Sequence, residues 1–228
     1  MTERRVLVTG ATGGIGSQVC RLLSASGYIP LVGYRSAKVM EASNLAAACG
    51  GSPILLDMLD NLGIEKAAMD LAADERPLVG AVIGASPPPL IGPFTRIASE
   101  EMDHFWKANV DGPRQLLAGL IKRIFRKQKY GSAVFVLTSA MGSAERAPMS
   151  QMAAYLISKF GLMGVAEVIK AEYPWLNIQS VYPDFTETPM LNAFDPRFLD
   201  TMRGKSPFVA PQTVAQEIVE KISRNGSL

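Results

Sequence analysis

The sequence predicts an α/β fold in which a doubly wound parallel sheet of six or seven strands is flanked by helices. Short apolar runs alternate with longer, helix-like stretches along the chain, as parallel strands joined by helices require. The runs are continuously apolar, which is typical of strands buried on both faces of a sheet. A glycine-rich turn follows the first run, and the 228 residues suffice to bury a sizeable core.

Six apolar runs are predicted as strands, at residues 6–8, 29–32, 53–56, 78–83, 133–137 and 178–181. The stretches predicted as helices span residues 15–26, 37–49, 61–73, 99–127, 151–172 and 211–223. No internal repeat or linker interrupts this order, so residues 1–228 are expected to form a single domain, with a short substrate lid at about residues 191–208. In such a sheet ligands bind beyond the carboxyl ends of the strands, so the residues after each run are the functional candidates.

Charge and cysteine content narrow the class of partner. The 23 basic and 21 acidic residues give a net charge of +2, too balanced for a dedicated nucleic-acid or membrane surface, so a small-molecule substrate is expected. Cys20 and Cys49 fall in predicted helices, which suits buried thiols in a reducing compartment, and the cytoplasm is the expected location. No signal peptide or membrane-spanning run is recognised, and a single histidine with two scattered cysteines predicts no metal site.

The glycine-rich turn at residues 9–16 reads Thr-Gly-Ala-Thr-Gly-Gly-Ile-Gly and opens the first predicted helix. Glycine lets the backbone turn sharply and lets a phosphate approach the helix N-terminus, where unpaired N–H groups favour an anion. The turn therefore predicts a dinucleotide phosphate site. Its candidate residues are Gly10, Thr12, Gly13, Gly14, Ile15 and Gly16.

The residues after the second predicted strand bear on the choice of cofactor. A carboxylate at this place would bind the ribose hydroxyls of NAD, whereas a basic side chain would pair with the 2′-phosphate of NADP. Arg35 and Ser36 stand here, and no carboxylate does. NADP(H) is therefore favoured over NAD(H).

Tyr155 and Lys159 are four residues apart and share one face of the predicted helix at 151–172. A positive charge about 4 Å away, worth roughly 4 kcal/mol at an effective dielectric constant of about 20, would lower the pKa of a phenol by about two or three units. Tyr155 is therefore the candidate general acid and base. Ser139 follows the fifth predicted strand and can hold a substrate oxygen, and Asn109 lies inside a helix where helix propensity alone would not select an amide.

The ordered set of glycine turn, Asn109, Ser139, Tyr155 and Lys159 resembles the short-chain dehydrogenase/reductases, over residues 5 to about 190. The resemblance implies a Rossmann-type fold and an NADP(H)-dependent oxidoreductase that transfers hydride to a carbonyl or from a secondary alcohol. It implies that Tyr155 exchanges the proton and that Lys159 lowers its pKa and binds the nicotinamide ribose. It further implies that Ser139 orients the carbonyl and that Asn109 supports a water relay to Lys159. A homodimer or homotetramer is also implied.

Further cofactor contacts follow from the same resemblance. Asp57 and Met58 resemble the pair that borders the adenine, although Asp57 also suits a helix N-cap, as does Asp60. Pro183 and Thr188 match the segment after the sixth strand, whose threonine touches the nicotinamide carboxamide.

The sequence departs from the family pattern at three places. Asp184 stands where the family has glycine, and aspartate tolerates positive φ less readily. The usual Asn-Asn-Ala-Gly is replaced by Ile-Gly-Ala-Ser at residues 83–86, where Gly84 and Ala85 still permit close approach of the backbone to a cofactor. No motif for a seventh strand is recognised, which favours six strands.

Two alternatives remain open at this point. Gly10, Gly13 and Gly16 also fit the glycine spacing of nucleotide-sugar epimerases and dehydratases, although those enzymes usually have a larger C-terminal substrate region. The altered segments around Gly84 and Asp184 are compatible with a catalytically silent, NADP(H)-binding sensor.

Overall fold

Six parallel strands form one sheet, in the order β3-β2-β1-β4-β5-β6, in the computed structural model, which describes residues 3–223. The strands are β1 (Arg4–Val8), β2 (Tyr28–Tyr34), β3 (Ser52–Leu55), β4 (Leu78–Ile83), β5 (Ser132–Val136) and β6 (Asn177–Val181). The predicted doubly wound, Rossmann-type fold is confirmed, with six strands rather than seven in the described part of the chain.

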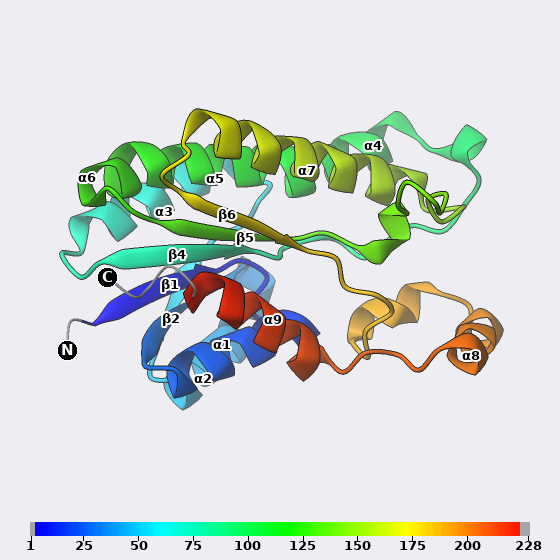
Figure 1. Cartoon of the computed structure of the whole chain (residues 1–228), viewed down its shortest axis with the longest axis horizontal. Coiled ribbons are helices and arrows are strands. Elements are labelled where there is room, and N and C mark those ends of the chain that lie inside the picture. The colour runs from blue at the N-terminus through cyan, green and yellow to red at the C-terminus, as the bar shows by residue number, and fades with distance from the viewer. Residues whose placement is uncertain (1–2, 224–228) are drawn as a thin grey trace.

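Helices cover both faces of the sheet (Figure 1). Their bounds are α1 (Gly14–Ala25), α2 (Val39–Ala48), α3 (Asn61–Ala73), α4 (Ser99–Trp106), α5 (Gly112–Leu120), α6 (Arg126–Gln128), α7 (Ala153–Glu172), α8 (Pro196–Lys205) and α9 (Pro211–Ser223). The helices α3, α5 and α7 lie on one face, and α1, α2 and α9 lie on the other. Among the residues described, no helix is both long and apolar enough to cross a membrane.

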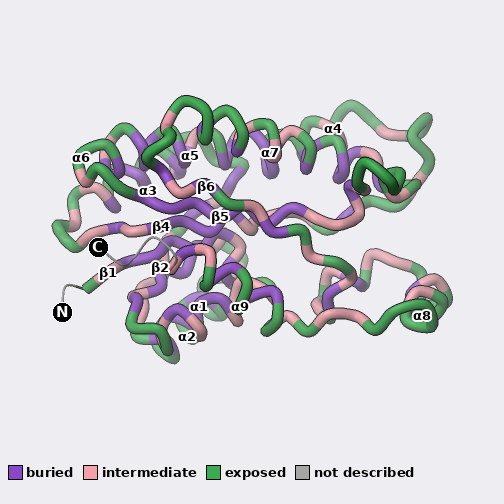
Figure 2. Tube along the Cα trace, viewed as in Figure 1, coloured by how far each residue is buried: buried purple, intermediate pink, exposed green. Residues whose placement is uncertain are grey.

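The core consists of two apolar layers, one on each side of the sheet, as the buried strands in Figure 2 show. In β1, Leu7 joins the layer under α3 and α5, whereas Val6 and Val8 join the layer under α1 and α9. Successive side chains of a strand point to opposite faces, so a strand covered on both faces must be apolar throughout. Cys20 and Cys49 lie in the second layer as buried free thiols, and burial raises the pKa of Cys20 to about 12.

The strand order opens a crevice at the carboxyl ends of β1 and β4. The chain leaves β1 for β2 and β3 on one side and then returns to β4 on the other, so the loops after β1 and β4 diverge. The register pairs Val8 of β1 with Val32 of β2 and with Val82 of β4. The glycine turn, the Arg35 segment and the Gly84 segment therefore start near the same edge of the sheet.

The predicted elements all occur, with ends that differ by no more than two residues. The predicted helix at 99–127 runs from α4 through α6 and contains two π-helical segments, Lys107–Asp111 and Ile121–Phe125. Such wider turns are frequent at functional sites, and the first of them carries Asn109. The sequence did not predict α8, whose N-cap Asp195 accepts hydrogen bonds from the N–H groups of Arg197 and Phe198.

Candidate active site

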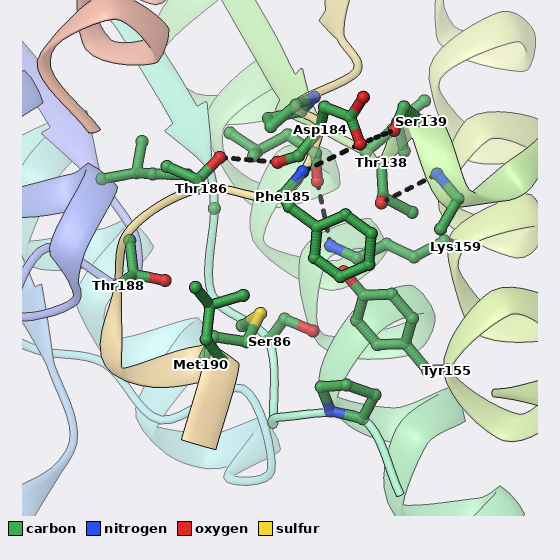
Figure 3. Close-up of a pocket in the computed structure, with 18 of the residues that line it drawn as sticks. Ser86, Thr138, Ser139, Tyr155, Lys159, Asp184, Phe185, Thr186, Thr188 and Met190 are labelled. Carbon is green, nitrogen blue, oxygen red and sulfur yellow. Dashed lines mark hydrogen bonds between the residues drawn. The ribbon is translucent and has the colours of Figure 1, made fainter. Parts of the chain in front are cut away.

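A cavity of about 480 Å³ lies at the carboxyl ends of the strands. It is lined by residues from the glycine turn, the ends of β4 and β5, the first turns of α7 and the segment after β6. Figure 3 shows how several of these side chains converge. The predicted site residues that line it are Gly10, Ile15, Gly16, Gly84, Ser139, Tyr155, Lys159, Pro183 and Thr188. The structure thus brings the predicted catalytic hydroxyls and the glycine turn to one cavity.

The glycine turn is too crowded for side chains at its key positions. Gly10 has φ of 67°, and a Cβ there would lie 2.8 Å from Cα of Ala85. A Cβ on Gly16 would collide with the carbonyl oxygen of Gly10. The first turn of α1 has no acidic residue, and its N-cap Gly13 supplies no side-chain hydrogen bond. The N–H groups at this helix end are therefore available to an anion, and the pyrophosphate of a dinucleotide fits them.

The Gly84 segment is held by a side chain that sequence reasoning missed. The hydroxyl oxygen of Thr9 accepts hydrogen bonds from the N–H groups of Gly84, at 2.9 Å, and Ala85, at 3.1 Å. The same hydroxyl donates to the carbonyl of Val82. Thr9 thus fixes this loop although the asparagines of the family pattern are absent.

Thr188 closes the cavity against the glycine turn. A Cβ on Gly14 would lie 2.8 Å from Cβ of Thr188, so the two segments are in van der Waals contact. On the other side, the N–H of Ser139 donates to the carbonyl of Pro183 at 2.9 Å. The segment after β6 is therefore packed between the glycine turn and the loop that carries Ser139. A segment that contacts the nicotinamide end of a cofactor would need to lie there.

Other predicted cofactor residues lie outside the cavity. Arg35 and Ser36 are exposed at the end of β2, and Met58 is buried in the core. Asp57 accepts a hydrogen bond from the N–H of Leu59, whereas Asp60 is the N-cap of α3. Four further predicted residues also do not line the cavity, although they belong to the glycine turn and the Gly84 segment, other residues of which do: Thr12, Gly13, Gly14 and Ala85.

Tyr155 and Lys159 are both buried on α7, with the Lys159 nitrogen 5.5 Å from the centre of the Tyr155 ring. The ammonium donates a 2.9 Å hydrogen bond to the carbonyl of Val136, which fixes it at the end of β5. Burial raises the pKa of Tyr155 to about 12, and a hydrogen bond with Thr138 only partly opposes this. Burial also lowers the pKa of Lys159 to about 8. Burial therefore outweighs the expected lowering of the Tyr155 pKa by Lys159.

Asn109 is fully buried in the π-helical segment, and on α7 it bonds to Ser158 rather than to Lys159. Its amide nitrogen donates to the hydroxyl of Ser158 at 2.8 Å, and that hydroxyl donates to the carbonyl of Tyr155 at 2.7 Å. Among the described residues the Asn109 Oδ1 atom has no hydrogen-bond partner. A buried acceptor of this kind is normally satisfied by an ordered water, which is compatible with the expected relay. The sequence had not singled out Ser158.

Ser139 lies between a carboxylate and a guanidinium. Its hydroxyl donates to Oδ1 of Asp184 at 3.0 Å, and its carbonyl accepts from Arg146 at 2.6 Å. The non-glycine residues with positive φ in the described chain are Lys129 and Gln151. Asp184 therefore occupies the glycine position with an ordinary backbone conformation, and the expected backbone conflict does not arise.

The predicted lid segment at 191–208 supplies part of the cavity wall. Phe194 and Met202 line the cavity, whereas Phe198 and Phe208 pack around Phe185. The Phe185 ring is 5.1 Å from the Phe208 ring in a stacked arrangement. Phe194 and Met202 thus face the cavity, whereas Phe198 and Phe208 hold the segment together.

Comparisons with known proteins agree with this geometry. A sequence model described as short chain dehydrogenase matches residues 4–197. An uncharacterised oxidoreductase of Mycobacterium tuberculosis is 28% identical over 75% of this chain and 62% of its own length, so the chain spans less than two thirds of that relative. An acetoacetyl-CoA reductase of an Acinetobacter species is 26% identical over 100% of this chain and 94% of its own length.

Solved structures share the fold. Actinorhodin polyketide ketoreductase with NADPH has a TM-score of 0.87 and 21% identity, covering 97% of this chain and 91% of its own. A 3-ketoacyl-(acyl-carrier-protein) reductase from Brucella melitensis, complexed with NADH, has a TM-score of 0.87 and 18% identity, covering 99% of this chain and 93% of its own. Identities this low show similarity of fold alone, and the two cofactors differ.

Proposed function

The chain belongs to the short-chain dehydrogenase family, and from this premise we propose that it is an NADP(H)-dependent oxidoreductase that reduces a carbonyl or oxidises a secondary alcohol. One observation carries the proposal. The same cavity is lined by the glycine turn, by Tyr155 and Lys159, and by the Ser139 hydroxyl. A dinucleotide held at the turn would therefore extend toward the groups that can exchange a proton with its substrate.

Tyr155 is the proton donor for carbonyl reduction. When bound, NADPH supplies the hydride that the carbonyl carbon accepts. With a pKa of about 12 the phenol is protonated at neutral pH, as an unperturbed phenol also is, so Tyr155 has a proton to give to the carbonyl oxygen as negative charge develops there. The products would be an alcohol and NADP⁺, and Tyr155 would be left as a phenolate that must be reprotonated.

Lys159 supports the phenolate that this step creates. At pH 7 the ammonium is protonated, because its pKa of about 8 lies above that pH. Held by the carbonyl of Val136, it stays within 5.5 Å of the Tyr155 ring and attracts the negative charge. For reprotonation, the unsatisfied Asn109 Oδ1 marks a place for water beside α7.

The preference for NADP(H) rests on Arg35. In the described residues, the Arg35 side chain makes neither a hydrogen bond nor an ion pair, and it is exposed at the end of β2 beside Ser36. A guanidinium without a protein partner can pair with a 2′-phosphate through two parallel hydrogen bonds. No carboxylate follows β2 to bind the ribose hydroxyls of NAD instead.

Assembly as a homodimer or homotetramer through α4 and α7 is part of the proposal. Trp106 and Phe160 are exposed on these helices, and Gly161 of α7 lies against the Trp106 ring. Exposed aromatic side chains on adjoining helices favour association with another copy. Light scattering should give a mass above that of one chain, and Trp106→Glu with Phe160→Glu should reduce it to that of the monomer.

The test of the function is NADPH oxidation by the purified protein with a panel of ketones, aldehydes and 3-oxoacyl thioesters. Consumption of NADPH with at least one carbonyl, absent in a Tyr155→Phe variant, supports the proposal. Tight NADPH binding without turnover across the panel would instead support the silent sensor. Interconversion of nucleotide sugars without net loss of NADPH would support the epimerase alternative.

A further inference from the structure

We propose that Asp184 and Ser139 form a hydroxyl-binding subsite that selects substrates with a second hydroxyl beside the reacting carbon. The inference rests on the proposed function, because it assigns the substrate class of the same cavity. The substrates it names are α-hydroxy ketones and the vicinal diols that they become on reduction.

The Asp184 carboxylate is held in place from several sides. Its Oδ1 atom accepts hydrogen bonds from the Ser139 hydroxyl, at 3.0 Å, and from the N–H of Phe185, at 2.9 Å. The main-chain carbonyl of Asp184 accepts a hydrogen bond from the hydroxyl of Thr186 at 2.7 Å, which fixes the backbone at this position. These contacts, some visible in Figure 3, orient the side chain before any substrate arrives.

The subsite offers acceptors rather than donors. Among the described residues no hydrogen bond is made to Oδ2 of Asp184, so this oxygen can accept one. Ser139 has a single hydroxyl proton, which it gives to Asp184, and so it presents only lone pairs to the cavity. Tyr155 remains as the donor for the carbonyl oxygen. A substrate that bonds to both Tyr155 and Asp184 has a carbonyl oxygen, which accepts from Tyr155, and a hydroxyl on the next carbon, which donates to Asp184.

Much of the surrounding cavity wall is apolar, so it offers few replacements for a hydrogen bond lost at Asp184. The cavity lining also includes Ser86, Ser206 and many apolar side chains, among them Met149, Phe185, Met190 and Phe194. Asp184 is exposed, so a plain ketone that covers it displaces water from Oδ2 and returns no hydrogen bond to that atom, at the cost of the lost bond. A substrate hydroxyl replaces the displaced water and removes that penalty.

The charges in the cavity favour a neutral hydroxyl over an ammonium group. Arg146 and Lys159 line the same cavity, and Arg146 donates to the main chain of Ser139 itself. A cationic substrate would be repelled by both side chains although Asp184 attracts it. The subsite therefore fits a hydroxyl, which donates a hydrogen bond without adding charge.

The kinetic test compares 2-hydroxycyclohexanone with cyclohexanone, which differ by one hydroxyl. With NADPH, the wild-type protein is expected to show a kcat/KM at least tenfold higher for the hydroxy ketone. Asp184→Gly should bring the two values within about twofold. Glu145→Gln is the matched control, because it removes a carboxylate from the neighbouring loop without touching the cavity lining, and it should keep the wild-type ratio.

A binding test separates this inference from the proposed function. Trans-cyclohexane-1,2-diol and cyclohexanol are titrated into the NADPH-bound protein, where neither alcohol can be oxidised. The diol should bind at least tenfold more tightly, and Asp184→Gly should abolish the difference. Asp184→Asn, which keeps the shape of the side chain, should reduce it several-fold if the glycine variant does not fold. Equal binding of the two alcohols by the wild type overturns the subsite, whereas a diol preference without any ketone reduction overturns only the proposed function.

Discussion

The hydroxyl of Ser139 donates a 3.0 Å hydrogen bond to Oδ1 of Asp184, which lies 45 positions further along the chain. The Ser139 proton that could bind a substrate carbonyl is therefore already engaged. A carbonyl substrate must compete with a carboxylate, which is the stronger acceptor. The glycine of the family pattern would leave the serine free of that competition.

Asp184→Asn should raise kcat/KM for simple ketones. An amide oxygen accepts the Ser139 proton less strongly than a carboxylate does, so the serine can turn toward the substrate carbonyl. The release of one charge-assisted hydrogen bond predicts an increase of about threefold to tenfold. Steady-state rates with cyclohexanone and NADPH measure it, and a decrease for this substrate would contradict the competition.

Tyr155→Phe should lower kcat at least about 10²-fold to 10⁴-fold while it leaves NADPH binding nearly unchanged. The substitution removes only the phenolic oxygen of a buried ring, which packs edge-on against Phe105 at 6.3 Å, so the fold is retained. Rates come from NADPH absorbance and affinity from NADPH fluorescence. Turnover at the wild-type rate would exclude Tyr155 as the proton donor.

Lys159→Met should change the pH dependence of stability in the cofactor-free protein. Burial lowers the pKa of Lys159 to about 8 from 10.5, so between these pH values the unfolded chain binds more protons than the folded one. The Lys159 contribution is therefore unfavourable below pH 8 and is relieved as pH rises to 10.5. The stability difference between variant and wild type should shrink by about 2–3 kcal/mol from pH 7 to pH 10. Urea unfolding at both pH values measures it, and a constant difference would show that the lysine is not desolvated.

Arg35→Ala should weaken NADPH binding at least about tenfold and NADH binding less than about twofold, because only NADPH carries the 2′-phosphate. Lys38→Ala is the matched control, since this neighbouring cation is already paired with Glu41 at 2.7 Å. Its effect on NADPH binding should be smaller. Equal losses for both cofactors in the Arg35 variant would remove the case for NADP(H).

Local pattern was sufficient to predict the strands, the main helices and nine of the residues that line the cavity. The glycine turn needs φ of 67° at Gly10, and the local sequence indicates this because glycine stands at that position in a glycine-rich run. Contacts between residues far apart in the chain cannot be predicted from a local sequence pattern. The bond from Gly84 to Thr9 spans 75 positions, and the one between Ser139 and Asp184 spans 45.

The ionisation of Tyr155 could not be predicted from sequence for a related reason. The four-residue spacing from Lys159 indicates proximity, but it says nothing of the burial that raises the phenol pKa. By contrast, the missed helix α8 had a local signal: Asp195 followed by Pro196, an N-cap residue with proline at the first helical position.

Two glycine-to-alanine variants should show where glycine is required. A Cβ on Gly16 would collide with the carbonyl of Gly10 and lie 2.8 Å from Cα of Ala11, so Gly16→Ala must displace the turn. It should lower the free energy of unfolding by about 1–3 kcal/mol and weaken NADPH binding. Gly164→Ala is its matched control, because a Cβ there meets no atom within 4 Å on α7, and it should stabilise the protein by about 0.5–1 kcal/mol. Denaturant unfolding and NADPH fluorescence measure both. If Gly16→Ala bound NADPH as the wild type does, the close turn would not be what holds the cofactor phosphates.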